Sequence, residues 1–283
     1  MKAPRFDPRL VIFDLDGVVY RGDEAVPGAV ALIDGLRERG ILVRFATNNS
    51  MTTRDGYVTR LADMGIRTLP DEIVTSTSAT IDHLRLHLPE VRRVLALGAP
   101  GMVVELLAAG FDATPAADAA PPAYDGGTLT AGYDAVIAGL DPDFGYRRLA
   151  VASAALRSGA RFIATNADAR YPTLSGFLPG AGTIVAALQA ASGVVPMIIG
   201  KPEPAMFQAI LERAGVSPAE ALAVGDNPDA DIVAARRAGI ASILVLTGVV
   251  DADAAALLPD ERRADAVAVG PDEVASLLGL SLR

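Results

Sequence analysis

The chain of 283 residues contains no cysteine and no tryptophan, and aromatic residues make up 5% of it. The absence of cysteine excludes disulfide bonds and zinc or iron–sulfur sites with cysteine ligands, and it is typical of a reducing compartment. The small aromatic fraction argues against a surface that binds nucleic acids by base stacking. The formal net charge of -9 argues further against binding to any polyanion.

Hydrophobic runs that would serve as targeting or membrane segments are also lacking. The N-terminus, MKAPRFDPRL, has no apolar signal-peptide core. The stretch between Arg170 and Lys201 carries no charge, but glycine, proline and polar residues interrupt it, which argues against a membrane-spanning helix. We therefore expect a cytoplasmic protein with no membrane or nucleic-acid partner.

The chain is instead a regular alternation of short apolar runs and helical stretches. Apolar runs include residues 10–15 (LVIFDL) and 221–226 (ALAVGD), and helical stretches include residues 53–64 and 146–157. Such alternation is typical of βαβ units. It predicts an α/β fold with a doubly wound parallel sheet and helices on both faces.

Two aspartates, Asp14 and Asp16, stand at the end of the first apolar run. Alternation along a strand turns both side chains to the same side, and burial of unpaired carboxylates is costly, so the pattern predicts a positive partner beside them. The Asp-x-Asp pattern occurs three more times in the chain, but only this pair is followed at once by a glycine, Gly17. A glycine there lets backbone N–H groups approach a ligand.

Two other apolar runs end as abruptly in polar residues, one at Thr47, Asn48 and Asn49 and the other at Asp226. The carboxyl ends of parallel strands form the ligand crevice of a doubly wound sheet. We therefore expect these residues to converge with the aspartate pair on one site.

Lysine is rare, since only Lys2 and Lys201 among the 25 lysine and arginine residues are lysine. Lys201 follows the apolar run MIIG, which predicts a further strand end. A compact ammonium suits a point contact to phosphate or carboxylate better than a planar guanidinium does. We expect Lys201 to belong to the same site.

The segments DLDGVVYRGDEAVPGA, TNNS, GKPEPAMF and GDNPDADI resemble, in order, the four motifs of the haloacid dehalogenase-like (HAD) phosphatases. The branch that they resemble most contains NagD, phosphoglycolate phosphatases and p-nitrophenyl phosphatases. AGLDPDFGYRRL, FIATNADARYP and LPGAGTIVAAL extend the resemblance over nearly the whole chain. One residue departs from the pattern of that branch, because Ala230 stands where threonine is usual.

The resemblance implies a Rossmann-like catalytic core at residues 1–81 and 182–283 with a large inserted α/β cap of the C2 type at residues 82–181. The segment between Thr47 and Lys201 is indeed too long for a loop, and domains are tolerated as insertions at exposed loop tips. A cap would close over the site, exclude water and select the leaving group. The resemblance also implies a homodimer formed through the cap.

The activity that the resemblance implies is Mg²⁺-dependent hydrolysis of small phosphomonoester metabolites. Asp14 would be the nucleophile that forms an aspartyl-phosphate, and Asp16 the general acid and base. Mg²⁺ would bind Asp14, the Asp16 carbonyl and Asp226, with Asp231 in the outer coordination sphere. This agrees with the chemistry, because attack on a phosphate ester requires strong local positive charge.

Phosphate and substrate contacts are also implied by the resemblance. The phosphoryl oxygens would be bound by the Thr47 hydroxyl and by the backbone at Gly17 and Asn48, and Lys201 would balance their charge. Five residues outside these contacts would face the substrate: Asn49, Asn166, Asp168, Tyr171 and Pro172. The alternative for these five is ordinary turn chemistry after a strand.

Other functions share parts of this constellation. A phospho-receiver also places acidic residues, threonine and lysine around Mg²⁺, but it needs neither a large cap nor an acid/base carboxylate at Asp16. A dehalogenase of the same fold lacks the metal, and a non-catalytic metabolite sensor would not need intact motifs. The residues leave the substrate open among phosphoglycolate, glycerol phosphate, pyridoxal phosphate, nucleoside monophosphates and sugar phosphates.

Overall fold

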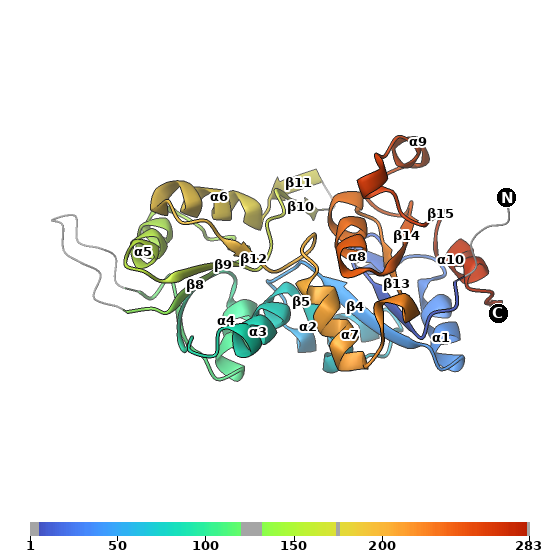
Figure 1. Cartoon of the computed structure of the whole chain (residues 1–283), viewed down its shortest axis with the longest axis horizontal. Coiled ribbons are helices and arrows are strands. Elements are labelled where there is room, and N and C mark those ends of the chain that lie inside the picture. The colour runs from blue at the N-terminus through green and yellow to red at the C-terminus, as the bar shows by residue number, and fades with distance from the viewer. Residues whose placement is uncertain (1–5, 120–131, 174–175, 282–283) are drawn as a thin grey trace. The chain divides into compact units, whose positions relative to one another are not determined.

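The computed structural model describes residues 6–119, 132–173 and 176–281, which divide into two compact units (Figure 1). The core unit comprises Met1–Thr47, Arg54–Val74 and Lys201–Arg283, and the inserted unit comprises Asn48–Thr53 and Thr75–Gly200. The segment that the sequence predicts as the cap, residues 82–181, lies within the inserted unit. The predicted cap boundaries and the function of the cap stay predictions.

The core unit is built on a six-stranded sheet with the order β15-β14-β13-β1-β4-β5. Its strands are β1 (Leu10–Phe13), β4 (Leu42–Thr47), β5 (Ile73–Thr75), β13 (Ala221–Gly225), β14 (Ala241–Val245) and β15 (Ala266–Ala268). β1 pairs in parallel with β13 on one side and with β4 on the other. The direction of strand addition therefore reverses at β1, where a doubly wound sheet forms its ligand crevice.

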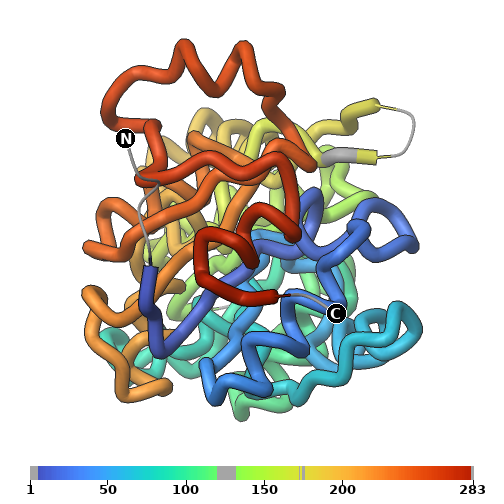
Figure 2. The backbone as a smooth tube through the Cα atoms, turned by 90° about the vertical axis from the view of Figure 1, so that its right-hand side faces the viewer, coloured from blue at the N-terminus to red at the C-terminus, as the bar shows by residue number. Residues whose placement is uncertain are grey.

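Helices cover the core sheet because its strands are apolar on both faces. The helices of this unit are α1 (Ala29–Glu38), α2 (Arg54–Asp63), α7 (Ala205–Ala214), α8 (Val233–Ala238), α9 (Ala252–Ala256) and α10 (Pro271–Leu277). Val11 and Phe13 of β1 pack in one cluster with Leu32 of α1 and Val274 of α10. In Figure 2, α10 at the red end of the chain lies beside the blue N-terminal segment, and it contacts α1.

The inserted unit has a sheet of its own, with the strand order β12-β9-β8-β6-β7 and parallel pairing throughout. Its strands are β6 (Arg93–Leu97), β7 (Asp112–Pro115), β8 (Ala135–Ala138), β9 (Arg161–Ala164) and β12 (Met197–Ile198). Figure 1 shows α5 (Tyr146–Arg157) and α6 (Ala181–Ser192) on one side of this sheet and α3 (Ser76–His87) and α4 (Pro100–Ala108) on the other. A separate antiparallel pair joins β10 (Arg170–Thr173) to β11 (Gly176–Pro179).

The apolar run before Lys201 belongs to this second sheet. Its strand β12 pairs with β9, so Lys201 follows an edge strand of the inserted unit and not a strand of the core sheet. An apolar strand followed by a polar residue is compatible with either sheet, because the sequence of a strand does not show which other strand it pairs with.

The uncharged stretch between Arg170 and Lys201 forms β10, β11, α6 and β12. The longest helices in the described part of the chain have 12 residues, and none there combines the length and hydrophobicity of a membrane span.

Candidate active site

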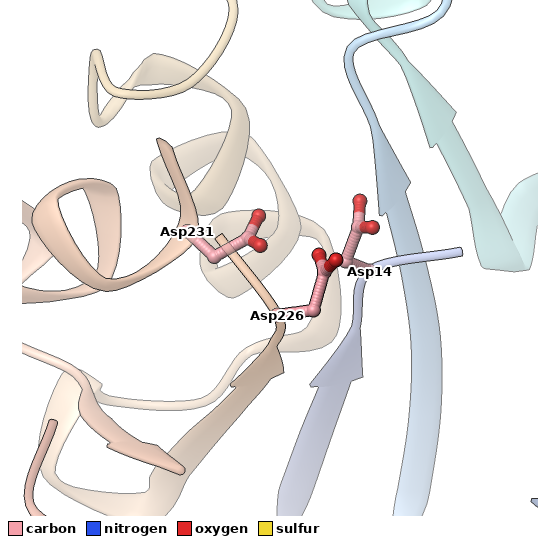
Figure 3. A group of neighbouring side chains, drawn as sticks. All are labelled: Asp14, Asp226 and Asp231. Atoms are coloured by element: carbon pink, nitrogen blue, oxygen red, sulfur yellow. The ribbon is translucent and has the colours of Figure 1, made fainter. Parts of the chain in front are cut away.

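Three carboxylates come together at the end of the core sheet. Asp14 directly follows β1, Asp226 directly follows β13, and Asp231 lies in a π-helical turn (Pro228–Ile232). One carboxylate oxygen of each lies within 4.8 Å of the others, and Figure 3 shows the three side chains turned toward one another. The strand ends at Asp14 and Asp226, two of those that the sequence predicts to converge, are therefore adjacent.

Lys201 lies between two of these carboxylates. Its ammonium donates to Oδ1 of Asp14 at 2.5 Å, to Oδ1 of Asp231 at 2.6 Å and to the backbone oxygen of Ala46 at 3.0 Å. Only 2% of the residue is exposed. Burial lowers the pKa of Lys201, but the carboxylates of Asp14 and Asp231 together outweigh it and raise that pKa, so the side chain stays cationic.

The charges of this cluster do not balance by themselves. Three carboxylates face one ammonium, which leaves two negative charges uncompensated when all groups are ionised. Burial raises the pKa of Asp14 well above its usual value; Lys201 opposes this rise, and Asp231 and Asp226 add to it. A largely buried set of oxygen donors with surplus negative charge fits a hard divalent cation such as Mg²⁺ or Ca²⁺.

Glycines allow the carboxylates to pack this closely. A Cβ at position 225 would lie 2.3 Å from the Cβ of Asp231, and one at position 248 would lie 1.7 Å from Oδ2 of Asp226. Asp226 is held from the same side by the backbone N–H of Val249, which donates to its Oδ2 at 2.9 Å. Any larger residue at either glycine would displace a carboxylate of the cluster.

The turn after β14 is a part of the site that sequence reasoning missed. The Thr247 hydroxyl donates to the Gly17 backbone oxygen at 2.6 Å, and Gly248 and Val249 enclose the Asp226 carboxylate. A signal was present, since the apolar run ASILVL ends in threonine and glycine as abruptly as the other strands of the sheet end. Without the strand order, nothing placed this end beside Asp226.

Asp16 follows Asp14 by two residues and directly precedes Gly17, and it has partners of its own. The Tyr20 hydroxyl donates to its Oδ2 at 3.3 Å. Burial raises the pKa of Asp16, while the Arg60 guanidinium and then the Tyr20 hydrogen bond oppose the rise. A carboxyl group with a raised pKa suits an acid that must hold a proton near neutral pH. Sequence reasoning did not single out Tyr20 or Arg60.

The remaining predicted residues fall into two groups. Thr47 is the buried last residue of β4 in the core unit. Within the inserted unit, the amides of Asn48 and Asn166 donate to Oδ2 of Asp168 at 3.0 and 2.9 Å. The Asn49 side chain accepts a hydrogen bond from the Met51 backbone at 2.8 Å, which is turn chemistry.

Tyr171 and Pro172 lie in β10, where they pair with Leu178 and Phe177 of β11. The structure therefore brings Asn48, Asn166 and Asp168 together. Substrate contact by any of the five predicted residues stays a prediction.

Comparison with known proteins decides the family. The haloacid dehalogenase-like hydrolase family matches residues 11–112, and the related HAD-hydrolase-like family matches residues 198–274. An acid sugar phosphatase of Staphylococcus aureus is 37% identical over 238 residues, which are 84% of this chain and 86% of that protein. The chain belongs to the haloacid dehalogenase-like hydrolases.

Solved structures place this HAD chain among the phosphatases. A 4-nitrophenylphosphatase of Thermotoga maritima superposes with a TM-score of 0.85 at 31% identity, covering 96% of this chain and 98% of that one. A glycerol phosphate phosphatase of Mycobacterium tuberculosis in complex with magnesium gives 0.82 at 33% identity, covering 95% of this chain and 76% of that one. The chain is a HAD phosphatase of the NagD-like branch, as its motifs predict, and the predicted α/β fold is confirmed.

Ala230, which departs from the usual threonine of this branch, leaves the HAD carboxylate cluster supported. Lys201 donates a hydrogen bond to Oδ1 of Asp231, and the Asn227 backbone N–H donates to its Oδ2 at 3.0 Å. The Ala230 backbone N–H donates to the Asn227 side chain at 3.3 Å. The turn that presents Asp231 is thus formed by Asn227 and does not depend on a hydroxyl at position 230.

The pH dependence of stability follows from Asp226. Burial, followed by the Asp231 carboxylate, raises the pKa of Asp226 to about 7, whereas an unfolded chain has an aspartate pKa of about 3.9. Between these values the folded HAD protein in EDTA binds a proton that the unfolded chain releases, so its stability rises as pH falls.

We therefore expect Tm in EDTA to rise as pH is lowered from about 8 to about 5.5. Mg²⁺ affinity, measured by calorimetry, should weaken over the same range because the metal must displace that proton. Asp226→Asn is the matched control, since its Tm should depend less on pH. A wild-type Tm that falls steadily over this range would contradict the assignment.

Lys201→Arg is expected to lose nearly as much activity as Lys201→Ala, about 10²-fold or more in kcat for p-nitrophenyl phosphate. A guanidinium is larger than an ammonium and cannot direct three N–H groups at the three oxygens around Nζ. Lys2→Arg is the matched control, because it makes the same chemical change outside the motifs. Thermal unfolding of each variant checks the fold, and more than about half the wild-type activity in Lys201→Arg would refute the geometric reason.

Proposed function

We propose that the chain is a Mg²⁺-dependent phosphatase that hydrolyses small phosphomonoesters through an aspartyl-phosphate on Asp14. The observation that carries this proposal is the contact between Asp14 and Lys201 inside a cluster of three carboxylates, two of them buried. A nucleophile, a fixed cation and a set of metal ligands lie together, which is what phosphoryl transfer requires.

The metal would be held by Asp14, Asp226 and the Asp16 carbonyl, while Asp231 supports the cluster through its contact with Lys201. A bound Mg²⁺ would supply positive charge that offsets the nucleophile and the phosphoryl oxygens. The Val249 backbone N–H and the close approach of Gly248 hold the Asp226 carboxylate facing the cluster. This proposed ligand is therefore oriented without a bound metal.

In the first step Asp14 attacks phosphorus. Lys201 already contacts Oδ1 of Asp14, so attack falls to Oδ2, and a bond forms between that oxygen and phosphorus. The bond from phosphorus to the leaving oxygen breaks, and Asp16 gives its proton to that oxygen. The product alcohol leaves, and the phosphoryl group stays on Asp14.

In the second step water attacks the phosphoryl group. Asp16, now ionised, takes a proton from the water as a bond forms between the water oxygen and phosphorus. The bond from phosphorus to Asp14 breaks, which restores the carboxylate and releases inorganic phosphate. Lys201 balances the charge of Asp14 in both steps, and Thr47 and Asn48 are proposed to bind the phosphoryl oxygens.

The names of the relatives favour a phosphorylated sugar or polyol as the substrate. One relative is an acid sugar phosphatase, and another is a glycerol phosphate phosphatase. We assign selection of the leaving group to the inserted unit, with Asn49, Asn166, Asp168, Tyr171 and Pro172 as its proposed contacts. A homodimer through this unit also stays a prediction, and light scattering at assay concentration decides it.

A panel of phosphorylated metabolites tests the function. The purified chain with Mg²⁺ is expected to release inorganic phosphate from p-nitrophenyl phosphate and, faster, from a subset of sugar or polyol phosphates. Asp14→Asn is the control, since it keeps the shape of the side chain without the nucleophile. If the Asp14→Asn variant released phosphate as fast as the wild-type chain, the phosphatase activity would not come from this site.

Substrate selection by Tyr171 has its own test. Tyr171→Phe is expected to change the kcat/KM ratio between two metabolites by about tenfold where one of them accepts a hydrogen bond from the hydroxyl. Turnover of p-nitrophenyl phosphate should change little. Asp168→Asn is a poorer probe, because Asp168 already accepts hydrogen bonds from two amides. An equal loss on all substrates would place Tyr171 in the chemical step or in folding.

A further inference from the structure

Tyr20 is a buried residue whose hydroxyl reaches the reaction site. Its side chain is 0% exposed, and the hydroxyl donates to Oδ2 of Asp16 at 3.3 Å. The Gly17 backbone N–H donates to the backbone oxygen of Tyr20 at 2.8 Å, and the Tyr20 backbone N–H donates to the backbone oxygen of Leu15 at 3.2 Å. Gly17 has a φ of 81°, which allows this tight return. The loop therefore carries the phenol back to the carboxylate four residues earlier.

Arg60 of α2 holds Tyr20 from the other side. Its guanidinium carbon lies 4.3 Å from the centre of the Tyr20 ring, which is the geometry of a cation–π interaction. The same guanidinium donates to the Gly22 backbone oxygen at 2.6 Å and lies 3.5 Å from Asp23. Gly22 and Asp23 form the turn between β2 (Tyr20–Arg21) and β3 (Glu24–Ala25). Arg60 thus fixes the ring and the hairpin together.

The hydroxyl, and not the ring alone, needs an explanation. A phenylalanine would fill the same space without a polar atom, and a buried hydroxyl is costly unless it is hydrogen-bonded. The bonding partner is the carboxylate of Asp16. Burial, followed by the Asp16 carboxylate, raises the pKa of Tyr20, so the phenol remains a donor.

We infer that Tyr20 is a positioning residue for Asp16 and that Arg60 holds Tyr20 in that position. The hydroxyl engages Oδ2, which leaves Oδ1 as the oxygen that faces the leaving group and later the water. Without this contact the carboxyl group is free to rotate, and proton transfer depends on its orientation. The inference rests on the proposed role of Asp16 as general acid and base.

The test compares substrates whose leaving groups need different amounts of help. In Tyr20→Phe, kcat/KM for glycerol 3-phosphate is expected to fall about tenfold, because an alkoxide must be protonated as it leaves. The kcat/KM for p-nitrophenyl phosphate should fall less than about threefold, because nitrophenolate leaves with little protonation. A purely structural role of Tyr20 would lower both values alike.

Two controls accompany this variant. Tyr146→Phe removes the same hydroxyl from an exposed tyrosine of α5 and should leave both values at the wild-type level. Arg60→Leu should show the same dependence on the leaving group as Tyr20→Phe. The Arg60 guanidinium also lowers the pKa of Asp16 directly, but the inference assigns the orientation of the carboxyl group to Tyr20, so adding Arg60→Leu to Tyr20→Phe should lower kcat/KM for glycerol 3-phosphate by less than about twofold more.

Each outcome bears on the inference. An equal loss on both substrates in Tyr20→Phe, or no loss, overturns the positioning role, while a leaving-group dependence in Asp16→Asn still supports the proposed function. If Asp16→Asn itself shows no such dependence, the acid role and the inference both fail. A full additional loss from Arg60→Leu in the double variant overturns the part assigned to Arg60.

Discussion

The Asp16→Asn variant is expected to release at most one p-nitrophenolate per chain in a rapid burst and then to turn over slowly. Asparagine keeps the shape and hydrogen bonding of the side chain, but it cannot give or take the proton. Transfer to Asp14 should survive with this good leaving group, whereas hydrolysis of the aspartyl-phosphate should slow by roughly 10² to 10⁴. Stopped-flow absorbance measures the burst amplitude and both rates.

The phosphoenzyme that accumulates should carry its label on Asp14. Mass spectrometry after an acid quench is expected to find the phosphate on the peptide that contains Asp14, the residue that Lys201 contacts at 2.5 Å. The Asp14→Asn variant should show neither burst nor label. Wild-type turnover by Asp16→Asn, or a label on any other residue, would show that the proposed mechanism is wrong even in a working phosphatase.

The same experiment separates the alternative functions. A phospho-receiver would keep its phosphorylation kinetics when Asp16 is changed, because it does not use an acid at that position. A dehalogenase would never carry phosphate, and a metabolite sensor would show neither burst nor turnover. Membership of the phosphatase branch favours the first expected result.

Treatment with EDTA is expected to abolish phosphate release, and added Mg²⁺ to restore it. Asp14, Asp226 and Asp231 leave two negative charges uncompensated beside Lys201, and a phosphate ester brings more. Without a divalent cation this repulsion opposes both substrate binding and attack. Phosphate release from p-nitrophenyl phosphate measures the effect, and equal rates with and without EDTA would remove the metal from the mechanism.

Calcium should bind to the same cluster without supporting turnover. The Mycobacterium tuberculosis relative is known in complex with magnesium and also with calcium. Calcium accepts more ligands at longer and more variable distances, so Asp14 would lose its alignment for attack. Calorimetry should therefore show Ca²⁺ binding that Asp226→Asn weakens, while the assay shows Ca²⁺ inhibiting the Mg²⁺ form. A rate with Ca²⁺ close to that with Mg²⁺ would contradict this reason.

The sequence by itself was sufficient for features that depend on neighbours along the chain. The alternation of apolar and helical stretches predicted the parallel α/β fold, and the helix predicted at residues 146–157 is α5 with the same bounds. Polar residues at strand ends identified Asp14 and Asp226, because the carboxyl ends of parallel strands form the ligand crevice of a doubly wound sheet. The scarcity of lysine pointed to Lys201.

Tertiary structure alone decided the features that depend on residues far apart in the chain. It assigned the strand before Lys201 to the second sheet, placed Lys201 between Asp14 and Asp231, and brought Arg60 over the Tyr20 ring. It also placed Gly248 so close to Asp226 that no side chain fits between them. Local patterns show which residues are apolar, polar or small, but the partner that each one meets depends on strand order and packing over the whole fold.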